Sequence, residues 1–406
     1  MSILRGKNIL LGLSGGIAIY KSASLLRRLT RDHGCNVTVV MTRSAQAFMT
    51  PLVFETFSGK EVITEMFESR SGIVGTRHID LVQQADLIAV IPASANIIGK
   101  ICAGIADDAL STMLIAARPE KTLIAPAMNH NMYNHPVMQR NLAQLRGLSY
   151  NLIEPETGEL ATAEEGWGVG RLPDEKTLLF YLEKACYAQK SPALRGKKVL
   201  VSGGPTREAL DDIRFISNPS SGKMGIALAE SAAKQGAKVV YVSGPSSLPD
   251  PLGCETIRVV SAEAMKTQIL QHFEEQDIVA MAAAVEDIRP KVKFAGKLKK
   301  QAIPEQLPLE RTPDILALLG KNKKKQLLVG FSVEVEKGIE HSLKKLREKN
   351  LDLIVLNDPG EPGAAFAGDT NRITLITPDG KANPLPLKSK EESAEAVWEQ
   401  LLKPEA

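Results

Sequence analysis

Short apolar segments alternate with longer amphipathic segments along the whole chain. In the first half they fall at residues 9–13, 37–41, 87–91 and 122–125, with a further one near 149–153, and in the second half at residues 199–202, 239–243, 278–282, 327–331 and 353–356. Apolar runs of this length are typical of strands buried on both faces of a parallel sheet. The chain is expected to end on a strand pair near residues 372–376 and 385 and a helix at 391–402. The pattern predicts an α/β fold, with two doubly wound, mostly parallel-sheet Rossmann-like domains in tandem.

The opening of a strand–helix–strand unit occurs twice. The first copy spans residues 6–16 and the second spans residues 196–204, and both read Gly-Lys, a polar residue, an apolar run and then Ser-Gly-Gly. Between the halves, residues 189–196 are polar and contain a proline, which is typical of a linker. We therefore predict domains at residues 1–190 and 191–406, each with a ligand site at the carboxyl ends of its strands.

Composition restricts the class of protein. The chain has 406 residues, a hydrophobic fraction of 44%, a charged fraction of 24% and a formal net charge of +3. These values are typical of a globular protein of two ordinary domains, and they argue against binding to nucleic acid or to a membrane surface. No apolar stretch of the sequence has the length of a membrane span, and no group of His and Cys has zinc spacing. We expect a cytoplasmic protein without a structural metal.

Two loops at strand ends in the first half have the residues of a phosphate site. Residues 12–21 place small residues and a hydroxyl at a strand-to-helix turn, where backbone N–H groups and the helix dipole attract an anion. Residues 92–96, Pro-Ala-Ser-Ala-Asn, can either cap the following helix or hold a phosphate. Each loop alone is equally consistent with a structural turn. Two of them on one sheet predict a mononucleotide site.

A third segment, at residues 126–133, follows the next strand and reads Pro-Ala-Met-Asn-His-Asn-Met-Tyr. Taken alone, Asn129 could cap a helix and the methionines could belong to the core. In order and spacing, the three segments together resemble the homo-oligomeric flavin-containing cysteine decarboxylases. The resemblance implies FMN as cofactor and a trimeric assembly of this domain, with the flavin between subunits. It also matches the family's histidine to His78.

The resemblance implies a role for each matched residue. In this family the flavin oxidises the thiol of a C-terminal cysteine to a thioaldehyde, next to which the carboxylate leaves readily as carbon dioxide. His78 is expected to act in this oxidative half-reaction as base or orienting group, and Asn129 to hold the substrate carboxylate. The residues expected to contact FMN are Ser14, Gly15, Gly16, Ile17, Thr42, Ser94, Ala95, Asn96 and Ser111.

One position departs from the family pattern. Where the coenzyme A branch of the family has a flap cysteine in a Gly-x-Leu-Ala-Cys-Gly context, this chain has Thr162, within residues 158–171. The cysteine is thought to be the acid of the reductive half-reaction, and an alcohol is a far poorer acid than a thiol. Three alternatives follow: another donor acts there, the unsaturated enethiol is released, or the site is inactive. We favour the first, because every other motif is present.

The second half has an unusually long loop after its first strand. It spans residues 205–221, whereas such loops usually have about 2 to 6 residues, and it ends on Ser-Ser-Gly-Lys at a helix start. The spacing is not that of a P-loop, so a standard nucleoside triphosphatase is a poor interpretation. Beyond the strand at 278–282 lie Asp287 and a lysine group at 297–300, placed where ammonium groups can meet a triphosphate.

These segments resemble phosphopantothenate–cysteine ligase, the usual fusion partner of the decarboxylase. The match is close at residues 206–208, 216–225 and 297–301 and extends over essentially the whole second half. The resemblance implies that CTP, with Mg2+, activates 4′-phosphopantothenate as an acyl-cytidylate, which L-cysteine captures, and that this domain is dimeric. Asn218 is expected to stabilise the acyl intermediate. The other expected contacts are Ala282, Ala283, Asp287, Lys297, Thr312, Pro313, Phe331, Lys345 and Lys349 for the nucleotide, and Ser220, Ser221 and Lys223 for the phosphate of phosphopantothenate.

Together the two resemblances predict a bifunctional enzyme of coenzyme A biosynthesis that converts 4′-phosphopantothenate into 4′-phosphopantetheine. A ligase with a flavin-binding regulatory or oxidative-only first domain is the alternative that Thr162 leaves open. A nicotinamide-dependent oxidoreductase is disfavoured, because the glycine fingerprint of dinucleotide sites is absent from the sequence. The choice of CTP over ATP rests on the resemblance alone.

Overall fold

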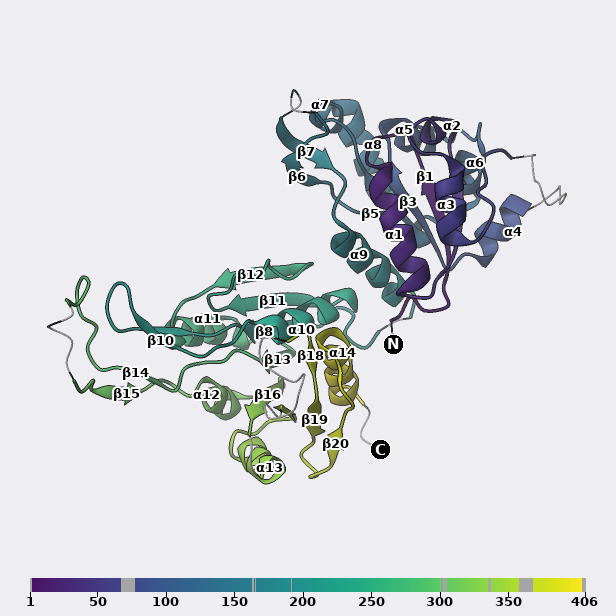
Figure 1. Ribbon diagram of the computed structural model, residues 1–406. Coiled ribbons are helices and arrows are strands. Elements are labelled where there is room, and N and C mark those ends of the chain that lie inside the picture. Colours follow the sequence, from purple (N-terminus) through teal and green to yellow (C-terminus); the bar gives the residue numbers. More distant parts are fainter. Residues whose placement is uncertain are drawn as a thin grey trace. The chain divides into compact units, whose positions relative to one another are not determined.

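The computed structural model describes residues 2–66, 77–162, 164, 166–190, 192–299, 301, 305–334, 337–357 and 368–403. The chain divides into two compact units, Met1–Lys190 and Ser191–Ala406, which Figure 1 shows in purple to blue-green and in teal to yellow. Within the described residues, no helix has both the length and the apolar character needed to cross a bilayer.

Unit 1 begins with alternating strands and helices and ends with a hairpin and a long helix. Its elements are β1 (Asn8–Leu13), α1 (Ile19–Arg31), β2 (Asn36–Met41), α2 (Arg43–Gln46), α3 (Pro51–Ser58), α4 (Arg77–Gln84), β3 (Leu87–Ala93), α5 (Ala95–Ala103), α6 (Ala109–Ala116), the 3-10 turn η1 (Pro119–Lys121), β4 (Thr122–Pro126), α7 (His130–Asn134), α8 (Pro136–Gly147), β5 (Asn151–Leu152), β6 (Glu156–Glu159), β7 (Trp167–Arg171) and α9 (Glu175–Ala188).

The sheet of unit 1 has five parallel strands in the order β2-β1-β3-β4-β5. The chain reverses its winding direction between β1 and β3, so the loops after these two strands diverge and leave a crevice at the carboxyl edge. In doubly wound sheets of this strand order the crevice is the ligand site, and flavodoxins bind FMN there. The fold therefore places the site before any side chain is considered.

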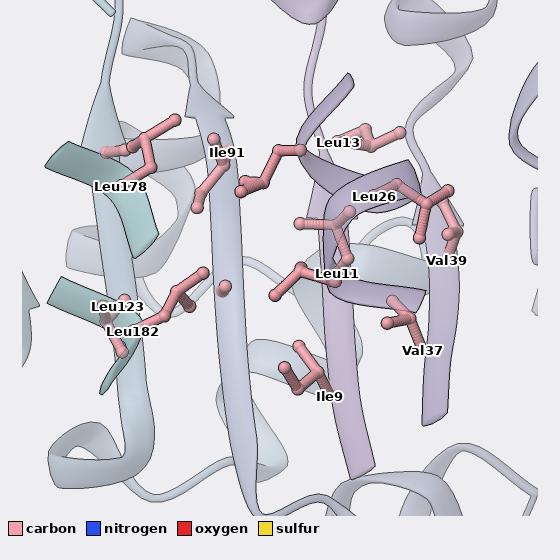
Figure 2. Close-up of a cluster of buried hydrophobic side chains, with 14 of the residues drawn as sticks. Ile9, Leu11, Leu13, Leu26, Val37, Val39, Ile91, Leu123, Leu178 and Leu182 are labelled. Carbon is pink, nitrogen blue, oxygen red and sulfur yellow. The ribbon is translucent and has the colours of Figure 1, made fainter. Parts of the chain in front are cut away.

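Helices cover both faces of this sheet because nearly every residue of its central strands is apolar. On one face Leu26 of α1 and Leu178 and Leu182 of α9 pack over the alternate residues of four strands, as Figure 2 shows; these are Ile9, Leu11, Leu13, Val37, Val39, Ile91 and Leu123. On the other face the intervening residues, Leu10, Val40, Ile88, Val90 and Ile124, pack against α5, α6 and α8. The two cores hold the carboxyl edge of the sheet rigid, as a site built on loops requires.

Unit 2 contains a larger sheet and three additional short strand pairs. Its elements are β8 (Lys198–Gly203), β9 (Arg207–Ala209), β10 (Phe215–Ser217), α10 (Lys223–Lys234), β11 (Lys238–Ser243), β12 (Cys254–Arg258), α11 (Ala262–Phe273), β13 (Ile278–Met281), β14 (Ile288–Pro290), β15 (Leu309–Arg311), α12 (Ile315–Asn322), β16 (Leu327–Val333), α13 (Gly338–Glu348), β17 (Leu353–Asn357), β18 (Thr370–Asn371), β19 (Ile373–Ile376), β20 (Ala382–Pro384), β21 (Lys388–Ser389) and α14 (Lys390–Leu401).

The main sheet of unit 2 has the order β12-β11-β8-β13-β16-β17-β19-β20; the first six strands are parallel, and β19 pairs antiparallel with both β17 and β20. Its winding reverses between β8 and β13, which is the dinucleotide-fold arrangement. Helices α11, α12 and α13 cover one face and α10 and α14 the other (Figure 1). Trp398 of α14 is buried and its indole N–H donates to the carbonyl oxygen of Leu228 in α10 at 3.2 Å.

The predicted fold class is confirmed, since both units are doubly wound α/β folds with mostly parallel sheets. The expected closing strand pair and final helix are β19, β20 and α14. The hairpins β9/β10 and β14/β15 were not predicted. Their strands have only three residues each, which is too short for an alternating pattern to be recognised.

Candidate active sites

Ser14 joins the β1 turn to the β3 turn at the switch point of unit 1. Its hydroxyl donates to the carbonyl oxygen of Pro92 at 2.8 Å and accepts the backbone N–H of Ser94 at 2.7 Å, and the residue is 1% exposed. The sequence predicts a direct cofactor contact, but the structure commits this hydroxyl proton to the protein. Ser14 therefore holds the two loops together, and an anion bound there would meet backbone N–H groups.

Two glycines allow other loops to approach the same edge. A Cβ on Gly15 would lie 2.5 Å from the Cβ of Ser44, just after Thr42, and one on Gly12 would lie 2.5 Å from Cδ1 of Leu110, next to Ser111. Thr42 and Ser111 thus lie close to the β1 turn, as the sequence predicts. Their hydroxyls accept backbone N–H groups as helix caps, from Ala45 at 3.2 Å and from Asp107 and Asp108 at 3.1 and 3.0 Å.

The other predicted FMN residues begin helices at this edge. Ser94 is the N-cap of α5, where its hydroxyl accepts the N–H of Ile97 at 3.5 Å, and Ala95 and Asn96 form the first turn. Gly16 and Ile17 precede α1, and the side chain of Ile17 is 57% exposed. The first turns of α1 and α5 therefore both start beside the crevice between β1 and β3, which suits a phosphate.

The segment after β4 is fastened to the hairpin β6/β7, which we call the flap. The side chain of Asn129 caps α7 by accepting the N–H of Asn131 at 2.8 Å, and the N–H of Met128 donates to the carbonyl oxygen of Gly170 in β7 at 3.0 Å. The N–H of Val169 donates to Nδ1 of His130 at 3.1 Å. The base of the flap is thus held against the residue that the sequence assigns to the substrate carboxylate.

Gly170 is the residue that permits this contact. Its φ is +137°, and a Cβ there would collide with the carbonyl oxygen of Met128. Gly170→Ala is therefore expected to displace the flap from residues 128–130 and to slow decarboxylation about 100-fold, the usual cost of misplacing a catalytic segment by about 1 Å. Decarboxylation of added 4′-phosphopantothenoyl-cysteine measures this, with ligation in the same preparation unchanged. The control is Gly147→Ala at the end of α8, where a Cβ has no neighbour within 4 Å; if both variants retain full decarboxylation, the flap contact is dispensable.

His78 and Thr162 come from other parts of unit 1. His78 is half-buried in the first turn of α4, and α4 leads back into β3, so this turn faces the carboxyl edge of the sheet. No described residue forms a hydrogen bond with its imidazole. Thr162 is exposed beyond the end of β6, in the tip of the flap. Both positions are compatible with the roles predicted for them.

Unit 2 contains a cavity of about 950 Å³ at the carboxyl edge of its sheet. Twelve of the thirteen residues that the sequence assigns to the ligase line it: Asn218, Ser220, Ser221, Lys223, Ala282, Ala283, Asp287, Thr312, Pro313, Phe331, Lys345 and Lys349. Lys297 is the exception; it is exposed beyond β14, in a segment held by backbone N–H groups of Gly296 and Leu298 that donate to Asp212 and Asp211.

The first turn of α10 forms one wall of this cavity. Gly222 is its N-cap with φ +85° and provides no side-chain cap, and a Cβ on Gly225 would lie 2.8 Å from the Cα of Gly203 in β8. The glycines thus allow the helix to begin directly against the end of the central strand. The hydroxyl of Ser221 accepts the N–H of Lys223 at 3.5 Å, and the start of the helix lies beside Ser220, Ser221 and Lys223, as an anion site requires.

The long loop that carries Asn218 is anchored to the end of β13. The hydroxyl of Ser217 donates to the carbonyl oxygen of Thr206 at 2.7 Å, and the hydroxyl of Thr206 accepts the N–H of Glu286 at 2.9 Å. The amide nitrogen of Asn218 is 3.4 Å from the carbonyl oxygens of Ala284 and Val285. These last contacts are long, so the amide can turn toward a substrate at little cost.

The Thr-Arg-Glu motif at residues 206–208 makes structural contacts in this fold. Thr206 is buried and holds the two loops as described, and Glu208, 4% exposed, accepts the N–H of Ala262 at the start of α11 at 2.7 Å. Arg207 places its guanidinium 4.5 Å from the ring centroid of Phe215 in the opposite strand. Thr206 and Glu208 therefore fix the geometry of the loop, and none of the three residues is among those lining the cavity.

Two lysines predicted to meet the triphosphate are paired with carboxylates. Lys345 is 2.5 Å from Glu334, and Lys349 is 2.8 Å from Asp314. The hydrogen bond from Lys345 holds the pKa of Glu334 below its ordinary value. Burial alone would raise the pKa of Asp314, but the hydrogen bonds from Lys349 and from a backbone N–H lower it overall. Both carboxylates are thus held in their ionised form, and an entering triphosphate must displace them or bring a cation.

The cavity residues that were not predicted from the sequence include three buried polar ones. Lys390, Asn371 and Asn357 line the cavity and are 4%, 5% and 9% exposed. Lys390 begins a helix after a serine cap, where a lysine is normally solvated, so only the tertiary structure reveals it. Among the described residues, no group of three or more His, Cys, Asp or Glu side chains gathers as a metal site.

The fold and the two switch-point sites define a two-domain nucleotide-binding α/β protein. The family described as "Flavoprotein" matches residues 2–184, and the "DNA/pantothenate metabolism flavoprotein C-terminal domain" matches residues 194–404. The coenzyme A biosynthesis bifunctional protein CoaBC of Bacillus subtilis is 46% identical over 389 residues, which cover 96% of this chain and 95% of that protein. The chain therefore belongs to the family of coenzyme A biosynthesis bifunctional proteins, and the resemblance stated from the sequence is confirmed.

Two further proteins are similar to this chain. A cysteine/cysteine sulfinic acid decarboxylase from an unknown prokaryotic organism is 42% identical over 358 residues, covering 87% of this chain and 99% of that protein. The crystal structure of the C-terminal domain of a CoaBC protein is 45% identical and covers 51% of this chain and 96% of that domain, with a TM-score of 0.44.

Proposed function

We propose that this chain catalyses two consecutive steps of coenzyme A biosynthesis. Unit 2 joins L-cysteine to 4′-phosphopantothenate, and unit 1 decarboxylates the resulting 4′-phospho-N-pantothenoyl-cysteine to 4′-phosphopantetheine. The observation that carries the ligase assignment is that residues of separate loops, strands and helices between Asn218 and Lys349 line one cavity. Near full-length identity to a CoaBC protein supports the pairing of the two activities in one chain.

In the ligase reaction, a carboxylate oxygen of 4′-phosphopantothenate attacks the α-phosphorus of CTP and diphosphate leaves. The cysteine amine then attacks the acyl carbon, loses a proton and displaces CMP. Lys345 and Lys349 are placed to receive the negative charge of the triphosphate once it displaces Glu334 and Asp314. Asn218 donates its amide N–H to the acyl oxygen as negative charge develops. Mg2+ enters with CTP. The triphosphate brings four negative charges into a cavity where Lys345 and Lys349 are already paired with carboxylates, so a cation accompanies it.

The residues of the β1/β3 crevice fit a flavin mononucleotide. The turns after β1 and β3 supply backbone N–H groups and two helix N-termini for its phosphate, and Ser14 fixes both turns. When bound, FMN supplies a two-electron acceptor for the substrate thiol. His78 takes the thiol proton, and the amide nitrogen of Asn129 holds the substrate carboxylate beside the base of the flap.

The return half-reaction needs a proton donor in place of the family's flap cysteine. Thr162 occupies that position and is exposed in the flap tip. In our proposal a bound water or a flap carboxylate donates this proton. The flap makes its anchoring contacts with Met128 and His130, so such a donor can be held beside residues 128–130. The alternative is that unit 1 stops at the unsaturated enethiol.

Product analysis of the full chain separates these possibilities. The protein is given 4′-phosphopantothenate, L-cysteine, CTP and Mg2+, and products are identified by mass spectrometry. We expect 4′-phosphopantetheine with one carbon dioxide released per cysteine consumed. Accumulation of an enethiol two hydrogens lighter would restrict unit 1 to the oxidative step. Accumulation of 4′-phospho-N-pantothenoyl-cysteine would restrict the activity to ligation, and omission of CTP, or its replacement by ATP, tests the nucleotide.

The assembly is proposed from the family as well. We propose a homo-oligomer of trimeric decarboxylase domains and dimeric ligase domains, in the cytoplasm where CTP is available.

A further inference from the structure

A glutamate beside the ligase cavity binds one of the two lysines expected to meet the triphosphate. Glu334 follows β16, its side chain is 19% exposed, and Oε1 lies 2.5 Å from the ammonium of Lys345. Lys345 lines the cavity, whereas Glu334 is not among the lining residues. Water screens a partly buried ion pair less than an exposed one, so this contact competes with any anion that enters the cavity.

The same carboxylate has a second basic neighbour. Oε2 of Glu334 lies 3.6 Å from Nδ1 of His341. His341 precedes Lys345 by four positions in α13, so the two side chains lie on one face of the helix, one turn apart. An imidazole can donate an N–H to a carboxylate whether or not it is charged. Glu334 can therefore give up Lys345 and still keep a partner.

The other lysine of the triphosphate region is paired with a carboxylate that is fixed in place. Lys349 lies 2.8 Å from Oδ2 of Asp314, and Asp314 is the N-cap of α12, where its Oδ1 accepts the N–H of Ala317 at 3.0 Å. Asp314 stays with the helix that it caps when Lys349 turns to a phosphate. Among the described residues no backbone N–H donates to Glu334. Of the two carboxylates, Glu334 is thus the one that can change partners.

The proposed ligase reaction gives such a carboxylate a purpose. Lys345 must bind the triphosphate of CTP and later release diphosphate, and both anions present the same phosphate chemistry to it. A protein carboxylate that competes for Lys345 weakens the binding of substrate and product by a similar factor. It therefore favours release of diphosphate at the cost of a higher KM for CTP.

We propose that Glu334 exchanges Lys345 for His341 when a polyphosphate enters the cavity, and returns to Lys345 when diphosphate leaves. The proposal rests on the ligase activity proposed above and deepens it. Glu334 and His341 are positioning residues, because they act on the nucleotide only through Lys345. The affinity for the triphosphate is then set by three side chains, of which only Lys345 touches the anion.

The test compares Glu334→Gln with His341→Ala in the full chain. Calorimetry measures the Kd for inorganic tripolyphosphate with Mg2+, and ligation kinetics give the KM for CTP. Glu334→Gln keeps the size of the side chain and removes the competing charge, so both constants fall about 5-fold and inhibition by diphosphate tightens equally. His341→Ala removes the second partner of Glu334, so both constants rise about 2-fold. A purely structural role would not move the two variants in opposite directions.

A double variant and a matched control complete the test. In Glu334→Gln/His341→Ala the effect of the histidine should vanish, because the carboxylate that it receives is gone. The control is Glu348→Gln, also on α13, whose partner Lys344 at 3.9 Å is not among the residues that line the cavity; it should behave as wild type.

Three results overturn the inference: unchanged or weaker tripolyphosphate binding by Glu334→Gln, a full effect of His341→Ala in the double variant, or a wild-type chain that does not bind tripolyphosphate. A wild-type chain that binds tripolyphosphate but does not ligate with CTP would instead overturn the proposed function. The calorimetric constants would then still decide the role of Glu334, because they do not depend on turnover.

Discussion

Decarboxylation stops in the His78→Asn variant while ligation continues. An asparagine side chain has nearly the size of imidazole and can form hydrogen bonds, but it cannot take up a proton at neutral pH. If His78 receives the thiol proton, decarboxylation falls by about 1,000-fold or more, within the range of lost general-base catalysis. The protein should remain yellow, because the predicted flavin contacts come from the loops after β1, β2 and β3 and from α6 rather than from α4.

Three readouts on one preparation make this result specific. Added 4′-phospho-N-pantothenoyl-cysteine measures decarboxylation, CMP release measures ligation, and the visible spectrum measures bound flavin. The control is His33→Asn; His33 follows α1 at the opposite edge of the sheet, where Nδ1 lies 3.0 Å from the hydroxyl of Ser2. Turnover of His78→Asn at the wild-type rate would remove this residue from the mechanism, and loss of flavin would make its role structural.

The fold could be predicted because its signals are local. Most of the parallel strands are short apolar runs such as 9–13, and the turn after β1 contains a glycine, Gly15, whose Cβ would lie too close to Ser44. Both kinds of signal lie within a few consecutive residues. The three-residue strands β9 and β10 have neither signal. They are too short to show a periodic pattern.

The sites were predicted less completely because the function of a polar residue depends on distant partners. Ser14 was assigned to the cofactor, yet its hydroxyl contacts Pro92 and Ser94, about 80 positions later in the chain. Lys390 was not assigned at all, because burial of a lysine at the start of a helix depends on the packing of α14 against α10. Sequence motifs identified which loops carry the sites, and tertiary contacts decided what each side chain does there.

Gly244→Ala is expected to eliminate ligation and leave decarboxylation intact. Gly244 follows β11, its N–H donates to the carbonyl oxygen of Gly203 at 2.9 Å, and a Cβ there would collide with the carbonyl oxygen of Pro205. Both colliding groups are fixed, one by the sheet and one by the bridge between Pro205 and Ala284. The clash cannot be relieved by turning a side chain, so the start of the long loop must move.

The displaced loop is the one that carries Asn218 to the cavity. We expect the free energy of unfolding of unit 2 to fall by about 3 kcal/mol, as for a severe overpacking substitution, and ligation to fall by more than about 100-fold. Thermal unfolding and CMP release measure the two effects. Gly380→Ala is the control, because a Cβ there has no neighbour within 4 Å and only the left-handed φ of +86° opposes the substitution.

Decarboxylation of added 4′-phospho-N-pantothenoyl-cysteine by Gly244→Ala decides how independent the two units are. Unit 1 has its own sheet and its own two cores, so it should decarboxylate this substrate at the wild-type rate even when unit 2 is destabilised. Together with His78→Asn, the variant then separates the two activities within one chain. A parallel loss of both activities would mean that unit 1 depends on an intact unit 2, which its separate core does not predict.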